Sequence, residues 1–171
     1  MYAELVAPPE PPTREGFTFA GWYQDKDCIY EWDLAAAPVQ QSMTLYAKWE
    51  AGQNTAYKVE HYLQNADGSY PDAASQTENL AGATGAAVEA VVQTTTGYHE
   101  DTENGSAVKS GTIAADGSLV LRVYYVRDTY ILTFKNAGEA DFVSTRRWGE
   151  SITAPALTVR RRAGGCQLLH R

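Results

Sequence analysis

The sequence has few of the residues that build the commonest chemical sites. Its 171 residues include two cysteines, Cys28 and Cys166, and three histidines. Two thiols so far apart do not form a disulfide framework, and a structural zinc site usually needs four ligands, often in close pairs. We therefore expect both thiols to be free, and we expect no metal centre and no cofactor.

Long apolar runs are also missing. No stretch approaches the roughly 18 apolar residues of a transmembrane helix, and the N-terminus has no basic segment followed by an apolar one, as a signal peptide would. The chain is therefore predicted not to insert into a membrane. We expect it to be either intracellular or a piece of a longer protein.

Basic residues are in the minority. The chain holds 14 Lys and Arg against 21 Asp and Glu, for a formal net charge of −7. This balance argues against a nucleic-acid partner, because proteins that bind nucleic acids present basic surfaces to the phosphates. Four arginines and no acid fall in the last 14 residues, so residues 158–171 are predicted to be an atypical basic tail.

No catalytic motif is visible. The sequence has no G-x-S-x-G and no phosphate-binding glycine loop. His61 falls on the apolar face of an expected strand and is interpreted as a partly buried, hydrogen-bonded histidine. Residues 99–104 (HEDTEN) are interpreted as an ordinary loop. A third cluster lacks the spacing of a calcium loop and is interpreted as a solvated loop; it comprises Asp25, Asp27, Glu31 and Asp33. The chain is therefore predicted not to be an enzyme.

Aromatic residues and strand patterns are what the sequence does contain. It has 11 Tyr and 4 Trp, which favour strands. Helical patterns are limited to two short candidates, 33–41 and 74–82. The predicted fold class is mostly β (α+β), in small modules. The period-two alternation of a half-buried sheet occurs in residues 44–49, 57–63, 118–126 and 129–135.

The strand patterns recur along the chain. AYKVEHY, from Ala56, aligns with TYILTFK, from Thr129, at a spacing of 73 residues. TLYAKW, from Thr44, aligns with VLRVYY, from Val120, at a spacing of 76. Similar spacings that keep the same order are typical of a tandem repeat array.

This alignment divides the chain into three predicted units. Residues 1–50 are expected to be a partial repeat without its first strand, 56–128 a complete module and 129–157 the opening half of a third repeat. A weaker echo, GFTF at Gly16 and GYHE at Gly97, falls in the same order.

The units resemble known repeats. PTREGFTFAGWYQD, followed by WDLAAAPVQQSMTLYAKW, resembles the internalin-B-type B repeat, also called the Listeria–Bacteroides repeat, over Tyr2–Trp49. Residues 57–127 look like the related repeat of mucin-binding proteins (MucBP). Residues 129–155 look like the opening half of another B repeat.

The resemblance implies small β-grasp-like modules, strung in tandem in secreted or wall-attached bacterial proteins. It implies a non-catalytic spacer or adhesion module in the extracellular space or cell wall, with the signal peptide and anchor outside this fragment. The alternatives are a glycan- or mucin-binding module, or an accessory repeat of a secreted hydrolase whose catalytic domain lies elsewhere. The expected partner is a protein or glycan at a cell surface. Incomplete terminal repeats would also allow self-association.

The aromatic side chains are assigned first to module cores, because units of about 70 residues must bury what large side chains they have. Exposed aromatic rings can also mark a binding surface, and Tyr23, Trp32 and Tyr46 are the candidate ligand contacts. The predicted core residues are Phe17, Phe19, Trp22, Trp49, Tyr57, Val59, Leu121, Val123, Tyr130, Leu132 and Phe134.

Overall fold

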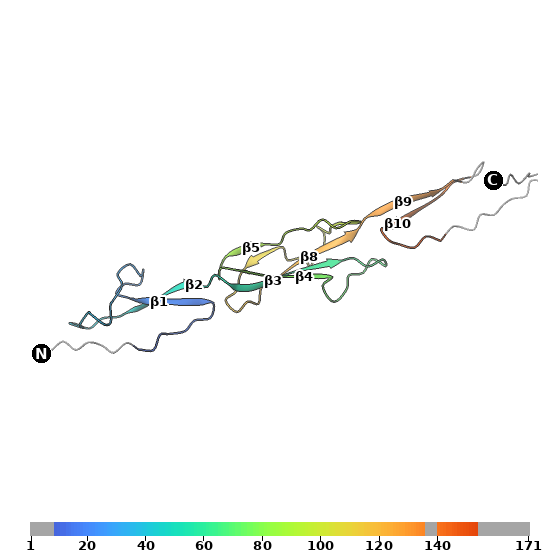
Figure 1. Cartoon of the computed structure of the whole chain (residues 1–171). Helices are drawn as coiled ribbons and strands as arrows, with labels where there is room; N and C mark the ends of the chain where they lie inside the picture. Colours follow the sequence, from blue (N-terminus) through green and yellow to red (C-terminus); the bar gives the residue numbers. More distant parts are fainter. Residues whose placement is uncertain (1–8, 136–139, 154–171) are drawn as a thin grey trace, which may run out of the picture.

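The computed structural model describes residues 9–135 and 140–153, in which ten strands form small sheets (Figure 1). No helix occurs in these two ranges, so the mostly β fold class is confirmed. The strands are β1 (Phe17–Tyr23), β2 (Tyr46–Ala51), β3 (Thr55–Leu63), β4 (Gln76–Gly82), β5 (Ala87–Glu89), β6 (Tyr98–Glu100), β7 (Ser110–Thr112), β8 (Val120–Arg127), β9 (Thr129–Phe134) and β10 (Phe142–Arg147).

The two helix candidates were wrong. Most of residues 74–82 forms β4, which pairs antiparallel with β3 from Thr55↔Gly82 to His61↔Gln76. This ladder satisfies the backbone groups of a segment whose local helix preference is weak. Residues 33–41 hold a turn instead of a helix, because the Asp33 carboxylate accepts the N–H of Ala35 (2.9 Å) and Pro38 follows.

The central sheet has four strands in the order β4-β3-β8-β6. Its two inner strands, β3 and β8, run parallel, from Lys58↔Val120 to Leu63↔Tyr125. The small β5–β7 sheet lies beside it. Strands from both ends of residues 55–127 thus meet at the centre of one sheet, and its buried apolar cluster consists of Val59, Ala90, Leu121, Val123 and Tyr125.

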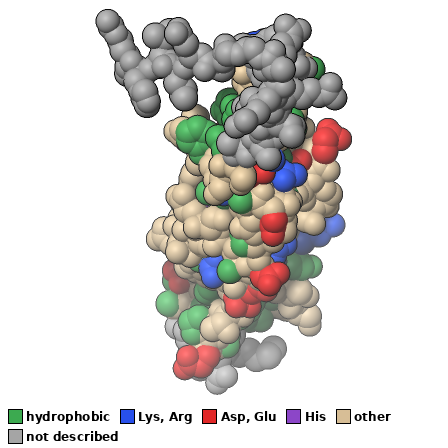
Figure 2. All heavy atoms as spheres, turned by 90° about the vertical axis from the view of Figure 1, so that its right-hand side faces the viewer, with side chains coloured by type: hydrophobic (Ala, Val, Ile, Leu, Met, Phe, Trp, Pro, Cys, Tyr) green, Lys and Arg blue, Asp and Glu red, His purple; other side chains and the backbone are tan. Residues whose placement is uncertain are grey.

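Two-stranded sheets flank the central sheet. β1 and β2 form one, and β9 and β10 the other. In the described residues no strand pairs with a strand of a different predicted unit. Figure 1 shows the sheets following one another along an elongated molecule. Figure 2, which views it from the side of β9 and β10, shows acidic and basic side chains scattered over the surface.

The strand pairs of the flanking sheets resemble pairs within the central sheet. In the β1–β2 pair, Phe17 lies opposite Ala51, and in the β6–β8 pair Tyr98 lies opposite Arg127. Both pairs are antiparallel and begin directly after a glycine. β9 and β10 pair antiparallel, as β3 and β4 do. The predicted basic tail, residues 158–171, lies outside the described residues.

Candidate functional site

The most deeply buried polar side chain of the described residues is that of His61, on β3, at 2% exposure. Its Nδ1 lies 2.9 Å from the hydroxyl oxygen of Tyr125, and that oxygen accepts the backbone N–H of Gln93 (2.9 Å). The Tyr125 hydroxyl therefore bridges the imidazole and the Gln93 backbone. Nε2 faces the carboxylate of Glu78 at 3.4 Å.

This hydrogen-bond network connects parts of the fold to one another. It ties β3 to β8 through His61 and Tyr125, and ties both to Gln93. Burial raises the pKa of the Tyr125 hydroxyl, so the phenol stays protonated and keeps its donor. The arrangement orients side chains within the core, and no serine, threonine or cysteine hydroxyl or thiol of the described residues is bonded to the imidazole.

The acidic loop after β1 is held together by one of its own carboxylates. Asp25 accepts the backbone N–H groups of Ile29 (3.1 Å) and Tyr30 (2.9 Å). The Tyr30 N–H is the main reason why the pKa of this carboxyl lies below its usual value. Within residues 9–135 and 140–153, no three His, Cys, Asp or Glu side chains gather closely enough to hold a metal ion. Asp25 therefore organises a turn.

The titratable side chains of residues 99–104 contact different partners. His99 Nδ1 lies 2.7 Å from the Asp128 carboxylate at an exposed position. Asp101 accepts the hydroxyl of Tyr70 (2.7 Å). Because these pairs diverge, the segment brings no common chemical centre together.

The three candidate ligand contacts occupy different environments. Tyr23 is only 8% exposed, and the Lys48 ammonium lies 3.4 Å from its hydroxyl and above its ring. This burial differs from the sequence expectation, because the cross-strand neighbours of β1 and β2 cover the ring. Tyr46, its partner on β2, is 40% exposed. Trp32 is half-buried.

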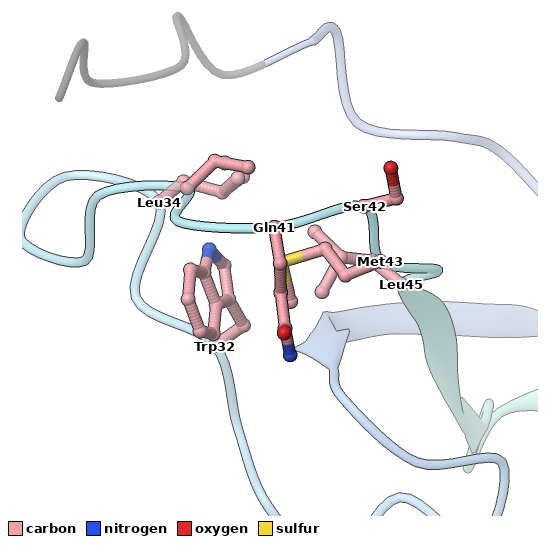
Figure 3. Close-up of a pocket in the computed structure, with 7 residues that line it drawn as sticks. Trp32, Leu34, Gln41, Ser42, Met43 and Leu45 are labelled. Carbon is pink, nitrogen blue, oxygen red and sulfur yellow. The ribbon is translucent and has the colours of Figure 1, made fainter. Parts of the chain in front are cut away.

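Trp32 and Leu34 line both of two shallow hollows of about 500 and 580 Å³. In Figure 3 the Trp32 indole lies on one side of the first hollow, with Met43 and Leu45 on the other. Its walls are mainly apolar, so it fits an apolar side chain or the face of a sugar ring. We call it the Trp32 hollow; its lining is Trp32, Leu34, Val39, Gln41, Ser42, Met43 and Leu45.

The predicted core residues divide by sheet. Val59, Leu121 and Val123 are at most 2% exposed. Tyr130 differs from expectation at 51% exposure, because no further strand or layer packs on β9 in the described part of the chain. The remainder are half-buried: Phe17, Phe19, Trp22, Trp49, Tyr57, Leu132 and Phe134.

A backbone joint connects the N-terminal and central sheets. The N–H of Gly52 donates to the carbonyl of Gly16, and the carbonyl of Gly52 accepts the N–H of Thr84, both at 2.8 Å. Gly16 has a φ of +73°, and a Cβ there would lie 2.8 Å from the Cα of Ala115. A side chain at Gly16 would therefore be strained and would push the two sheets apart.

A second joint repeats these bonds between the central and C-terminal sheets. The N–H of Asp128 donates to the carbonyl of Gly97 (2.9 Å), and its carbonyl accepts the N–H of Trp148 (2.8 Å). Gly97 has a φ of +80°, and a Cβ would collide with the Trp148 indole. Arg127 also donates to the Trp148 carbonyl. The echo of GFTF and GYHE in the sequence marks Gly16 and Gly97 as equivalent, but it does not indicate their partners Gly52 and Asp128.

The N-terminal part of the chain, which contains β1, is similar to a known family. Residues 1–48 match the model of the Listeria-Bacteroides repeat domain. This segment is a Listeria–Bacteroides repeat. The Trp32 hollow, β1, the first half of β2 and the Gly16 end of the first joint therefore belong to the repeat, whereas the MucBP-like identity of residues 57–127 stays a prediction.

Relatives of the chain share short stretches with it. Two proteins of Evansella cellulosilytica, whose names class them as membrane proteins, are 45% identical over 49 residues and 43% over 54. Internalin H of Listeria monocytogenes is 41% identical over 54 residues. These matches cover 29%, 32% and 31% of this chain, but only 7%, 6% and 10% of the relatives. No solved structure matches.

The described residues include no helix with the length and apolarity needed to cross a bilayer.

Proposed function

We propose that this chain is a non-catalytic repeat segment of a bacterial surface protein and that it acts as a spacer, holding other parts of that protein away from the cell. The Listeria–Bacteroides repeat at residues 1–48 and the relatives named as membrane proteins support a place in the cell envelope or outside it. The remaining sheets would be further repeats in tandem, including a MucBP-like one.

The observation that carries a spacer role is the recurrence of the joint. The backbone N–H of Gly52 and that of Asp128 each donate to a positive-φ glycine earlier in the chain. The carbonyl of each accepts a backbone N–H from a residue later in the chain. Two backbone bonds on opposite sides of a connecting residue restrict rotation there, because breaking either leaves a backbone group without its partner. A chain of such joints resists bending, as a spacer requires.

Distances between spin labels test this function. Labels on Thr77 of β4 and Thr145 of β10, both exposed, would be introduced after Cys28→Ser and Cys166→Ser. A stiff joint gives a narrow distance distribution. Gly97→Val should broaden it by displacing Trp148. Gly105→Val is the matched control, because a Cβ there meets nothing within 4 Å. A broad distribution in the chain without Gly97→Val would contradict the spacer function.

A second candidate function is binding of a glycan, as in a mucin-binding module. It is favoured by the Trp32 hollow, where the Trp32 indole lies beside the side-chain amide of Gln41 (Figure 3). Sugar rings stack on such faces and bond to such groups. In a glycan-array screen, Trp32→Ala should abolish any specific signal, and Tyr30→Ala, an exposed aromatic (66%) outside the hollow, should leave it intact.

A further inference from the structure

The inner pair of strands in the central sheet provides a template for the two flanking sheets. There β3 and β8 lie side by side in parallel, with Val59 opposite Leu121 and His61 opposite Val123. All four of these side chains are at most 2% exposed. The pairing therefore closes the sheet and completes its core.

β2 corresponds to β8. Ala51 lies opposite the first residue of β1, and Arg127 lies opposite the first residue of β6. These two residues are 76 positions apart, which is the spacing at which the sequences also align. By this spacing, Leu45 corresponds to Leu121 and Ala47 to Val123. β8 pairs with β6 along one edge and with β3 along the other. In the described residues β2 pairs only with β1, so its second edge, which corresponds to the β3 edge of β8, is open. Leu45, whose counterpart is fully buried, instead lines the Trp32 hollow.

β9 corresponds to β3 at the spacing of 73 residues. Leu132 then takes the place of Val59, and Phe134 that of His61. β9 pairs with β10 alone among the described strands. Leu132 and Phe134 are half-buried, with Tyr130 (51% exposed) on the same face. This hairpin has an apolar face and a free edge, but no parallel neighbour in the described structure.

We propose that β9 of one chain pairs in parallel with β2 of a second copy, in the register Leu132 to Leu45 and Phe134 to Ala47. The apolar face of the hairpin would then cover the Trp32 hollow. The sizes fit, because the larger Phe134 in place of His61 meets the smaller Ala47 in place of Val123. Open strand edges accept such additions readily.

Since β2 and β9 lie on either side of the central sheet (Figure 1), the hairpin meets β2 of another copy. The contact is head to tail, and it propagates unless two chains close on each other.

Sedimentation equilibrium of the full chain at rising concentration is the first test. Association should be concentration-dependent, and Leu132→Glu should weaken it at least about tenfold, because the pairing would bury a charge. Thr133→Glu, on the opposite face of β9, is the matched control and should weaken it much less. A full chain that stays monomeric, or association that Leu132→Glu leaves unchanged, would overturn the proposal.

Cross-linking tests the register independently of strand stability. Both native cysteines would first be replaced, by Cys28→Ser and Cys166→Ser. A chain with Thr133→Cys would then be mixed with a chain carrying Tyr46→Cys. Thr133 corresponds to Glu60 and Tyr46 to Arg122, and Glu60 and Arg122 lie opposite each other on β3 and β8. The introduced thiols should join under mild oxidation. Lys48→Cys in place of Tyr46→Cys shifts the register by two residues and should join much more slowly. Equal rates for both mixtures would refute the pairing.

Discussion

Single residues in this chain act mostly by satisfying backbone groups. Asp25 closes its loop, and Asp67 and Asp116 each accept the N–H of a serine two residues on, in turns of the same Asp-Gly-Ser sequence. Serine bonds hold the pKa of both these carboxyls below the usual value. All three carboxylates are bound in their charged form, so their loops should loosen in acid.

Asp25→Asn tests this acid sensitivity. The folded pKa of Asp25 is depressed, so the charge stabilises the loop above the unfolded pKa of about 3.9. That contribution is lost as pH falls through the lower folded pKa. We expect the unfolding midpoint in urea of the Asp25→Asn variant to lie below that of the natural chain at pH 7 and to approach it in acid. Asp27→Asn, which removes a charge from the same loop but none of the Asp25 hydrogen bonds, should lower the midpoint at pH 7 much less.

Tyr125→Phe tests the buried network. It removes the hydroxyl that accepts the Gln93 N–H and is hydrogen-bonded to His61 Nδ1, leaving buried groups without partners. The free energy of unfolding should fall by about 1–3 kcal/mol, measured by denaturant titration. Tyr124→Phe is the control, because that ring stacks on Tyr62 and its hydroxyl bonds to nothing in the described residues. Equal losses in both variants would contradict the structural role of the Tyr125 hydroxyl.

At the scale of elements, each two-stranded sheet depends on one packed face. In the N-terminal sheet Phe19 packs edge to face against Trp22 (5.4 Å between ring centroids) and Trp49 (5.7 Å). Such a pair of strands is marginal alone, so these three rings and the first joint hold the sheet. The central sheet instead has a closed, buried cluster.

Trp49→Ala should therefore unfold the N-terminal sheet preferentially. Full burial of such a ring is worth about 3–5 kcal/mol, and because Trp49 is half-buried we expect a loss of about 2–3 kcal/mol. Tyr46→Ala, at 40% exposure on the other face of β2, should cost less. Far-ultraviolet circular dichroism during urea unfolding measures both, and a larger loss for Tyr46→Ala would refute the assignment of faces.

At the scale of the whole molecule, stability is concentrated in the middle. The side chains with the least exposure, among them Tyr125, Ile113 and Leu121, all belong to residues 55–127. The two joints connect the flanking sheets to the central sheet. The flanking sheets should therefore unfold before the central sheet.

Limited trypsin digestion should leave a fragment near residues 55–128. Cleavage is expected first at exposed basic residues of the flanking segments, such as Lys26 and Lys135, because local opening there costs the least free energy. Mass spectrometry of the time course identifies the cuts. Early cleavage at Lys58 or Lys109, with the ends protected, would contradict this distribution of stability.

The sequence by itself determined the strand content and the recurrence of strands. Alternation in YKVEHYL and VLRVYY gave one face of each strand, because period two places Val59 with His61 on one side of β3 and Leu121 with Val123 on one side of β8. The run from PTREGFTFAGWY to LYAKW was specific enough to identify the Listeria–Bacteroides repeat, because its turn, aromatic residues and closing strand occur in one order.

Only the tertiary structure decided the partners. Residues 74–82 became β4 because β3 offered a ladder that local propensity does not report. Tyr23 was buried and Tyr130 left exposed because burial depends on which strands and layers cover a ring. The joints also required the fold, since the contacts of Gly16 with Gly52 and of Gly97 with Asp128 join residues more than 30 positions apart, and sequence pattern carries no information on such distances.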